Sequence, residues 1–148
     1  MSFQKVCIYG AGAIGGWVGA RLARAGCEVS VVARGATLAA LNAHGLRLVE
    51  GAAASAVPVR ASASPAELGV QDLVVIAVKA PAMADVALSI APLLGPNTVV
   101  LTAMNGVPWW FFEGFGGEHT GRRLKAVDPE GAIGRARRPS SSRAPRSR

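Results

Sequence analysis

The sequence predicts an α/β fold built on a doubly wound parallel sheet. Over the first 105 residues, short β-rich runs alternate with stretches of helical periodicity, an order that places helices on both faces of a parallel sheet. Residues 73–78 form an uninterrupted apolar run, which is typical of a strand buried on both faces. The first strand also leads directly into a glycine-rich turn and a helix, the arrangement that opens many βαβ units.

Glycines mark the ends of the first predicted strand and helix. Residues 5–9 form a compact apolar strand that ends at Gly10, and a helical pattern with apolar residues four apart follows over about 13–25. Gly26 ends this helix, and the β-branched run 29–33 predicts the second strand. The remaining elements, also bounded by Gly, Pro or small residues, are a helix over 36–43, short strands over 46–49 and 57–60, a strand over 73–78, a helix over 82–94 opened by Pro81, and a strand over 98–102.

The net charge of +7 is confined to the end of the chain. Residues 1–120 hold seven basic and seven acidic residues, whereas residues 121–148 hold nine and two. A nucleic-acid-binding domain carries its basic surface on a folded face, so this distribution argues against nucleic acid as a partner. Residues 135–148 contain only Arg, Ser, Ala and Pro and cannot form a core. We therefore expect one domain over 1–134 and a disordered basic tail over 135–148; an arm that contacts nucleic acid or anionic lipid is the alternative.

Cysteine and apolar content indicate a cytoplasmic protein. Cys7 and Cys27 are too few for a disulfide framework, and no apolar run approaches the length of a membrane span, so we expect no membrane partner. Cys7 lies within an apolar strand, which favours packing over nucleophilic chemistry. His44 and His119 have no carboxylate or cysteine neighbours at ligand spacing, so we expect no metal site.

The turn after the first strand matches the pattern G-x-G-x-x-G between a strand and a helix, the context that makes it informative. It reads Gly10-Ala11-Gly12-Ala13-Ile14-Gly15. Gly10 permits the tight turn, Gly12 lets a pyrophosphate approach the backbone, and Gly15 lets the helix pack closely on the strand. Free N–H groups at the helix N-terminus favour an anion. The pattern predicts a Rossmann-type dinucleotide site; the alternative is that these glycines serve only the strand–helix turn.

An arginine stands where many dinucleotide-binding units carry an acid. Arg34 follows the second strand, 19 positions beyond Gly15, where an NAD-binding unit has a carboxylate that binds the ribose 2′-OH. A carboxylate would repel a 2′-phosphate, whereas a guanidinium binds it with charge-assisted hydrogen bonds. Arg34 also precedes a helix whose dipole disfavours a cation, and an anionic ligand would explain that position. We predict NADP(H) rather than NAD(H) as the cofactor; a solvated surface arginine is the alternative.

Two further polar residues follow later strands. Lys79 ends the fourth main strand and Asn105 follows the fifth, so both are expected at the edge where ligands bind in open α/β sheets. Each has a simpler explanation, because a lysine that ends an apolar strand can reach water and Asn-Gly is a common turn dipeptide.

Aromatic residues gather after Asn105. Five of the eight lie within seven positions, and they are Trp109, Trp110, Phe111, Phe112 and Phe115. Such an apolar segment beside a candidate active-site edge is expected to line a substrate cleft or to be covered by a second domain, and if exposed it favours aggregation or a homodimer. The alternative is one amphipathic helix packed on its own sheet.

These motifs together resemble the N-terminal half of ketopantoate reductases (2-dehydropantoate 2-reductases) over about residues 4–134. The resemblance is carried by the glycine turn, Arg34, Val78-Lys79 and Asn105-Gly106-Val107. It implies NADPH-dependent reduction of a 2-keto acid to a 2-hydroxy acid, in the route to pantothenate. It further implies that the turn binds the pyrophosphate, Arg34 the 2′-phosphate, Lys79 the adenosine end, and Asn105 the nicotinamide and the substrate.

The sequence departs from that family towards its end. The family continues with a further strand and a helical C-terminal domain that supplies the catalytic lysine, and we assign no catalytic residue in this chain, Lys125 included. The Arg/Ser/Ala/Pro composition beyond Ala136 suggests a frameshift or truncation near Arg137. We therefore expect cofactor binding with little turnover; the alternative is a non-catalytic NADP(H)-binding module or an inactive truncated product.

Overall fold

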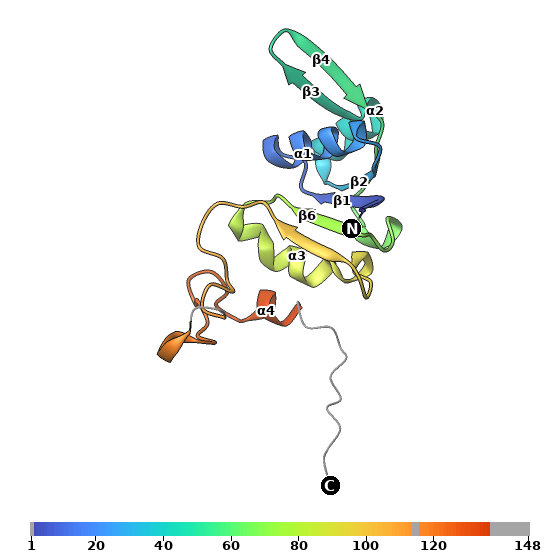
Figure 1. The fold of residues 1–148 in the computed structure, drawn as a ribbon. Coiled ribbons are helices and arrows are strands. Elements are labelled where there is room, and N and C mark those ends of the chain that lie inside the picture. Colours follow the sequence, from blue (N-terminus) through green and yellow to red (C-terminus); the bar gives the residue numbers. More distant parts are fainter. Residues whose placement is uncertain (1, 114–115, 137–148) are drawn as a thin grey trace.

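The structure of the chain is a computed structural model that describes residues 2–113 and 116–136. Its centre is a five-stranded parallel sheet with the strand order β5-β2-β1-β6-β7 (Figure 1). The strands are β1 (Lys5–Tyr9), β2 (Glu28–Val32), β5 (Arg60–Ser62), β6 (Leu73–Ile76) and β7 (Val99–Thr102). Because β1 pairs with β2 on one side and with β6 on the other, the strand order reverses beside β1. The prediction of a doubly wound, Rossmann-type α/β sheet is confirmed.

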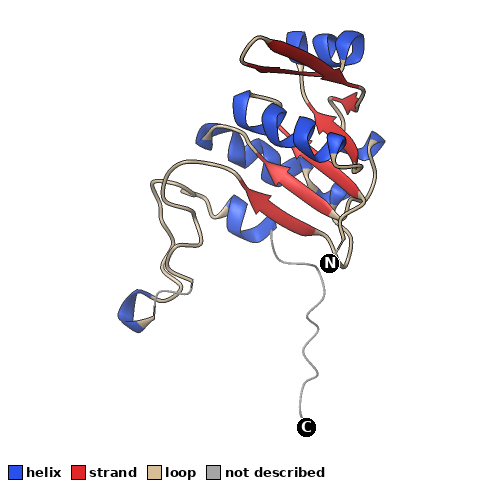
Figure 2. Ribbon diagram, turned by 45° about the horizontal axis from the view of Figure 1, so that its top comes forward, coloured by secondary structure: helices blue, strands red, loops and turns tan. Residues whose placement is uncertain are grey.

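Helices cover both faces of the sheet because successive residues of a strand point to opposite faces. The helices are α1 (Ala13–Arg24), α2 (Gly35–His44), α3 (Met83–Ser89) and α4 (Ala132–Ala136), with single 3-10 turns η1 (Pro65–Glu67), η2 (Ala80–Ala82), η3 (Ala91–Leu93) and η4 (Gly117–His119). Val6 and Ile8 of β1 pack on the side of α1 and α2. Cys7 and Tyr9 pack on the opposite side with α3 and α4. Figure 2 shows these helices arranged around the strands.

The segment after α2 corrects one prediction. β3 (Leu46–Glu50) and β4 (Ala53–Val57) form a separate antiparallel hairpin, and β5 joins the main sheet beside β2. The strand predicted over 57–60 is therefore wrong, since it combines the last residue of β4 with the first of β5. Pro58 lies between the two strands and has no backbone N–H to donate to either ladder. Small residues expected to connect two strands instead form β4, because they pair along the whole of β3.

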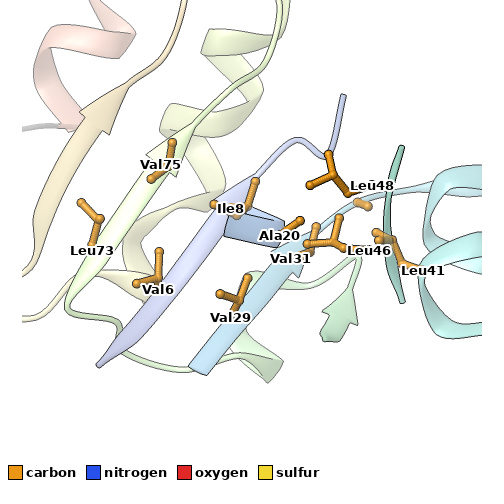
Figure 3. Close-up of a cluster of buried hydrophobic side chains, with 11 residues drawn as sticks. Val6, Ile8, Ala20, Val29, Val31, Leu41, Leu46, Leu48, Leu73 and Val75 are labelled. Carbon is orange, nitrogen blue, oxygen red and sulfur yellow. The ribbon is translucent and has the colours of Figure 1, made fainter. Parts of the chain in front are cut away.

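The hairpin contributes to the core on the side of α1. Figure 3 shows this cluster, in which side chains of three neighbouring strands meet residues of α1, α2 and β3. Its labelled members are Val6, Ile8, Val29, Val31, Leu73, Val75, Ala20, Leu41, Leu46 and Leu48, all of them buried. Removal of this apolar surface from water is the main term that stabilises the packing of α1 on the sheet.

Two predicted elements are longer than the observed ones. The helix predicted over 82–94 is interrupted, since α3 ends at Ser89 and η3 follows it. Pro92 has no N–H with which to continue the α-helical hydrogen bonding. The strand predicted over 73–78 ends at Ile76, although Ala77 still donates a backbone hydrogen bond to the Tyr9 carbonyl at 2.9 Å.

The aromatic segment is not a helix in its described part. Residues 109–113 form turns. The N–H groups of Phe111 and Glu113 donate to the carbonyls of Pro108 and Trp110, three residues back rather than four, so the alternative of one amphipathic helix is wrong there. Trp109 packs against the core on the side of α3, whereas the side chain of Phe111 is 42% exposed. Phe115 lies outside the described residues, as do residues 137–148 of the predicted tail.

Candidate functional site

The glycine turn joins β1 to α1 at the carboxyl edge of the sheet. Gly10 has φ +98°, a conformation that favours glycine, and its N–H donates a hydrogen bond to the Val32 carbonyl of β2 at 3.1 Å. A Cβ at Gly10 would lie 2.8 Å from Val78 Cγ1 and 3.0 Å from the Ala77 carbonyl oxygen. The fold itself therefore requires glycine at this position.

Gly15 is required by the contact between α1 and β1. A Cβ on this buried residue would lie 2.0 Å from the Gly10 carbonyl oxygen and 3.0 Å from Ile8 Cγ2. Backbone atoms cannot move aside as a flexible side chain can, so any larger residue would push the helix off the strand. This is the close helix–strand packing that the sequence pattern predicts.

Gly12 differs from both. Apart from Gly12 and its two chain neighbours, no atom of the described residues lies within 4 Å of the place where its Cβ would be. Its backbone angles, φ −72° and ψ −168°, are open to any residue. Gly12 borders a hollow of about 370 Å³ that is also lined by Trp17 of α1 and by Thr37 and His44 of α2. Neither backbone conformation nor packing explains a glycine here.

Free backbone donors stand beside this open space. The first hydrogen bond of α1 runs from the Gly16 N–H to the Gly12 carbonyl at 2.7 Å, so the N–H groups of Ala13, Ile14 and Gly15 precede it and have no partner within the helix. The side chains of Ala13 and Ile14 are exposed, which leaves this end of α1 accessible. Together with the helix dipole, these groups favour an anion.

Arg34 lies on the same edge, directly after β2. It is the N-cap residue of α2, and its side chain is 65% exposed. Its Nη1 lies 3.8 Å from Oδ2 of Asp85 in α3. The described residues offer Arg34 no second ion-pair partner.

Lys79 and Asn105 complete the set of predicted site residues. Both are exposed. Lys79 follows β6, which pairs with β1, and Asn105 follows β7, which pairs with β6. Parallel strands bring their carboxyl ends to one edge, so the structure places these residues on the same edge as the glycine turn. Asn105 borders a cavity of about 300 Å³ whose lining includes Met104, Val107 and Trp109.

The buried cysteine is not suited to nucleophilic chemistry, and the described residues form no metal-binding group. Burial raises the pKa of the Cys7 thiol from 9.0 to about 11, which disfavours the thiolate that nucleophilic chemistry needs. In residues 2–113 and 116–136, no three His, Cys, Asp or Glu side chains form a group that could hold a metal ion. No helix within those ranges is long and apolar enough to cross a membrane.

Comparison with known proteins identifies the family. The profile of the family described as ketopantoate reductase PanE/ApbA matches residues 6–108. The chain belongs to this family. A 2-dehydropantoate 2-reductase of Mesorhizobium japonicum is 56% identical over 131 residues, which make up 88% of this chain and 40% of that relative. The chain thus spans about 40% of the length of the curated relative and corresponds to the N-terminal region of the family.

Solved structures agree with the ketopantoate reductase fold. A structure described as a ketopantoate reductase from Ralstonia solanacearum superimposes with a TM-score of 0.86 and 58% identity, over 91% of this chain and 42% of that one. A D-mandelate dehydrogenase solved with NADH and anilino(oxo)acetate matches with a TM-score of 0.64 and 26% identity, over 70% of this chain and 34% of that one.

The sequence analysis missed the role of two residues of the chain. Asp85 contacts Arg34 only through the fold, and no sequence pattern links them. Trp109 was placed only within an aromatic cluster, yet its indole N–H is a buried donor without a hydrogen-bond acceptor among the described residues. Trp109 also lines both the cavity beside Asn105 and an apolar cavity of about 280 Å³ next to β7. Its position four residues after Asn105 was the available signal.

Proposed function

We propose that this chain binds NADP(H) at the carboxyl edge of its sheet and provides the nucleotide-binding part of a 2-dehydropantoate 2-reductase. Such an enzyme reduces 2-dehydropantoate, a 2-keto acid, to the 2-hydroxy acid pantoate. The observation that carries the proposal is Gly12, a glycine that neither the backbone angles nor the packing of the fold requires.

The surroundings of Gly12 fit the pyrophosphate of a dinucleotide. The missing side chain leaves open space directly above the backbone, and a pyrophosphate oxygen needs that space to reach main-chain donors. The N–H groups of Ala13, Ile14 and Gly15 are such donors. They would hold the pyrophosphate by hydrogen bonds that the helix dipole strengthens.

Arg34 carries the preference for NADP(H). A structurally similar protein was solved with NADH, so this fold by itself does not decide between the two cofactors. Within residues 2–113 and 116–136, the exposed Arg34 guanidinium has one ion-pair partner, Asp85 at 3.8 Å, which leaves it able to turn towards a 2′-phosphate. A planar guanidinium binds phosphate with two parallel hydrogen bonds.

Asn105 and Lys79 would serve opposite ends of the cofactor. When bound, the cofactor supplies the hydride, and the protein binds and orients the two reactants. The Asn105 amide can donate a hydrogen bond to an oxygen of the 2-keto acid, while Met104, Val107 and Trp109 form apolar walls of the adjacent cavity. Lys79 would place its cation near the adenosine end, as the family resemblance implies.

A non-catalytic NADP(H)-binding module is the second candidate. It is kept because Gly12, Arg34 and Lys79 are proposed to bind the cofactor and no residue of this sequence is assigned a catalytic step. Both candidates require NADPH binding, and only the reductase requires NADPH to be consumed in the presence of 2-dehydropantoate. Loss of NADPH absorbance on addition of that acid therefore distinguishes them.

An equilibrium titration followed by the fluorescence of the reduced nicotinamide tests the binding proposal. The wild-type chain should bind NADPH more tightly than NADH. Arg34→Ala should weaken NADPH binding by about 10- to 100-fold, since it removes charge-assisted hydrogen bonds, and should leave NADH binding nearly unchanged.

Arg21→Ala is the matched control for this titration. Arg21 is a similarly exposed arginine in an ion pair, with Glu50 at 3.2 Å, but it lies at the other end of α1 from the glycine turn. Its replacement should change neither affinity. An unchanged NADPH/NADH affinity ratio in Arg34→Ala would refute the assignment of NADP(H), and no binding of either nucleotide by the wild type would refute the nucleotide site.

A further inference from the structure

Arg34 and Asp85 approach each other across the carboxyl edge of the sheet. Arg34 follows β2, and Asp85 lies in the first turn of α3, the helix that follows β6 and η2. β1 lies between β2 and β6 in the sheet, so the elements that carry the two side chains flank the strand that ends in the glycine turn. The pair therefore sits where the proposed cofactor would cross the edge.

The geometry of the pair is that of a loose counter-ion. The Arg34 Nη1 to Asp85 Oδ2 distance of 3.8 Å is too long for a hydrogen bond. Both side chains are about two-thirds exposed, at 65% and 64%, and exposed pairs of this kind contribute little to folding stability. The carboxylate does compensate a cation that stands at the N-terminus of α2, where the helix dipole disfavours it.

The Asp85 carboxylate and a 2′-phosphate would compete for the same guanidinium. Both are anions that accept charge-assisted hydrogen bonds from it. A 2′-phosphate at Arg34 would therefore have to displace Asp85 and would also meet the repulsion of that nearby negative charge. NAD(H), which has only a hydroxyl at the 2′ position, would leave the pair in place.

We propose that Asp85 tunes cofactor selectivity as the resident counter-ion of Arg34, which the 2′-phosphate of NADP(H) must displace. Asp85 thus lowers the affinity for NADP(H) and leaves the affinity for NAD(H) unchanged. It therefore reduces the preference for NADP(H) over NAD(H) that Arg34 creates. This inference rests on the proposed function, since it requires the nucleotide to bind at this edge.

Asp85→Asn tests the inference, because it removes the charge and keeps the size of the side chain. In titrations of the full chain at low salt, NADPH affinity should rise by about three- to tenfold, as expected for removing a like charge near a phosphate at an exposed site. NADH affinity should change by less than about twofold, and added salt should reduce the gain for NADPH. Asp85→Glu, which restores the charge, should return the affinity ratio towards the wild-type value.

Glu50→Gln is the matched control. Glu50 is also an exposed carboxylate, 44% accessible, and is paired with Arg21 and Arg24 near the opposite end of α1. The substitution changes the net charge by the same amount but should alter neither affinity. Thermal unfolding of every variant, followed by circular dichroism, checks that the fold is kept.

Several outcomes would overturn the counter-ion role. One is an unchanged ratio of NADPH to NADH affinity in Asp85→Asn. Another is weaker NADPH binding by that variant, which would instead make Asp85 a residue that positions Arg34 for the phosphate. A gain that persists in full when Arg34 is already alanine would show that Asp85 acts without Arg34. Failure of the wild type to bind either nucleotide would instead refute the proposed function.

Discussion

Replacing Gly12 by alanine should weaken nucleotide binding strongly without unfolding the chain. Beyond the neighbouring residues 11 and 13, the added methyl group meets no atom of residues 2–113 and 116–136 within 4 Å, and the backbone angles suit alanine. Substituting alanine for glycine at a compatible position stabilises by about 0.4–1 kcal/mol through the unfolded state. Alanine is a poorer N-cap residue than glycine by a similar amount. The two effects oppose each other, so the free energy of unfolding should change by less than about 1 kcal/mol.

The same methyl group would occupy the space that the pyrophosphate needs. NADPH would lose some of its charge-assisted hydrogen bonds to the α1 amides, each worth about 1.5–3 kcal/mol. The dissociation constant for NADPH should therefore rise by at least about 10- to 100-fold. Because NADH carries the same pyrophosphate, its affinity should fall by a similar factor, unlike in the Arg34→Ala variant.

Gly15→Ala, in contrast to Gly12→Ala, should lose folding stability. Its Cβ would lie 2.0 Å from the Gly10 carbonyl oxygen, so the variant should lose about 3 kcal/mol or more of stability. Urea denaturation followed by circular dichroism measures the stability of both variants, and nicotinamide fluorescence measures binding. Normal NADPH affinity in Gly12→Ala, or a loss of stability as large as that of Gly15→Ala, would contradict the division between a binding glycine and a structural one.

Two titratable groups give further predictions. Asp72 accepts hydrogen bonds from the backbone N–H groups of Lys5 and Gln4, each at 2.9 Å, and these lower the pKa of its carboxyl below 3.8. Asp72→Ala should therefore be less stable than the wild type to urea at neutral pH, and the difference should disappear as the pH falls through that lowered pKa. Burial raises the pKa of Cys7 from 9.0 to about 11, so the wild type should lose stability as the pH rises between those values, and Cys7→Ala should lose less. In the native protein, a thiol reagent such as Ellman's should modify the partly exposed Cys27 well before Cys7; equal rates would contradict the burial of Cys7.

Local sequence patterns placed the first βα unit correctly. β1 has the predicted bounds, and α1 ends at Arg24, one residue before the predicted end. Both boundaries depend on glycines at 10 and 26 that end each element through their own backbone conformation, φ +98° and φ +93°. A feature set by residues adjacent in the chain is visible in the sequence.

Errors arose where distant contacts decide the structure. The residues of β4 are small and carry weak strand propensity, and they form a strand because β3 pairs with them and packs Leu46 and Leu48 on the side of α1. For the aromatic segment that begins at Trp109, one amphipathic helix was the alternative interpretation. The described part forms turns instead, with Trp109 packed against residues around α3. Tertiary packing overrides local propensity in both places.

The candidate site also has features that the sequence predicts and features that only the folded chain shows. The glycine pattern, Arg34, Lys79 and Asn105 were all recognisable from the sequence, because the order of strands alone assigns them to one edge of a parallel sheet. Only the folded chain distinguishes Gly12, whose Cβ position is open, from Gly10 and Gly15, whose Cβ positions are filled by other atoms. The approach of Asp85 to Arg34 was likewise invisible in the sequence, because two side chains on separate crossover connections meet only when the sheet brings those connections together.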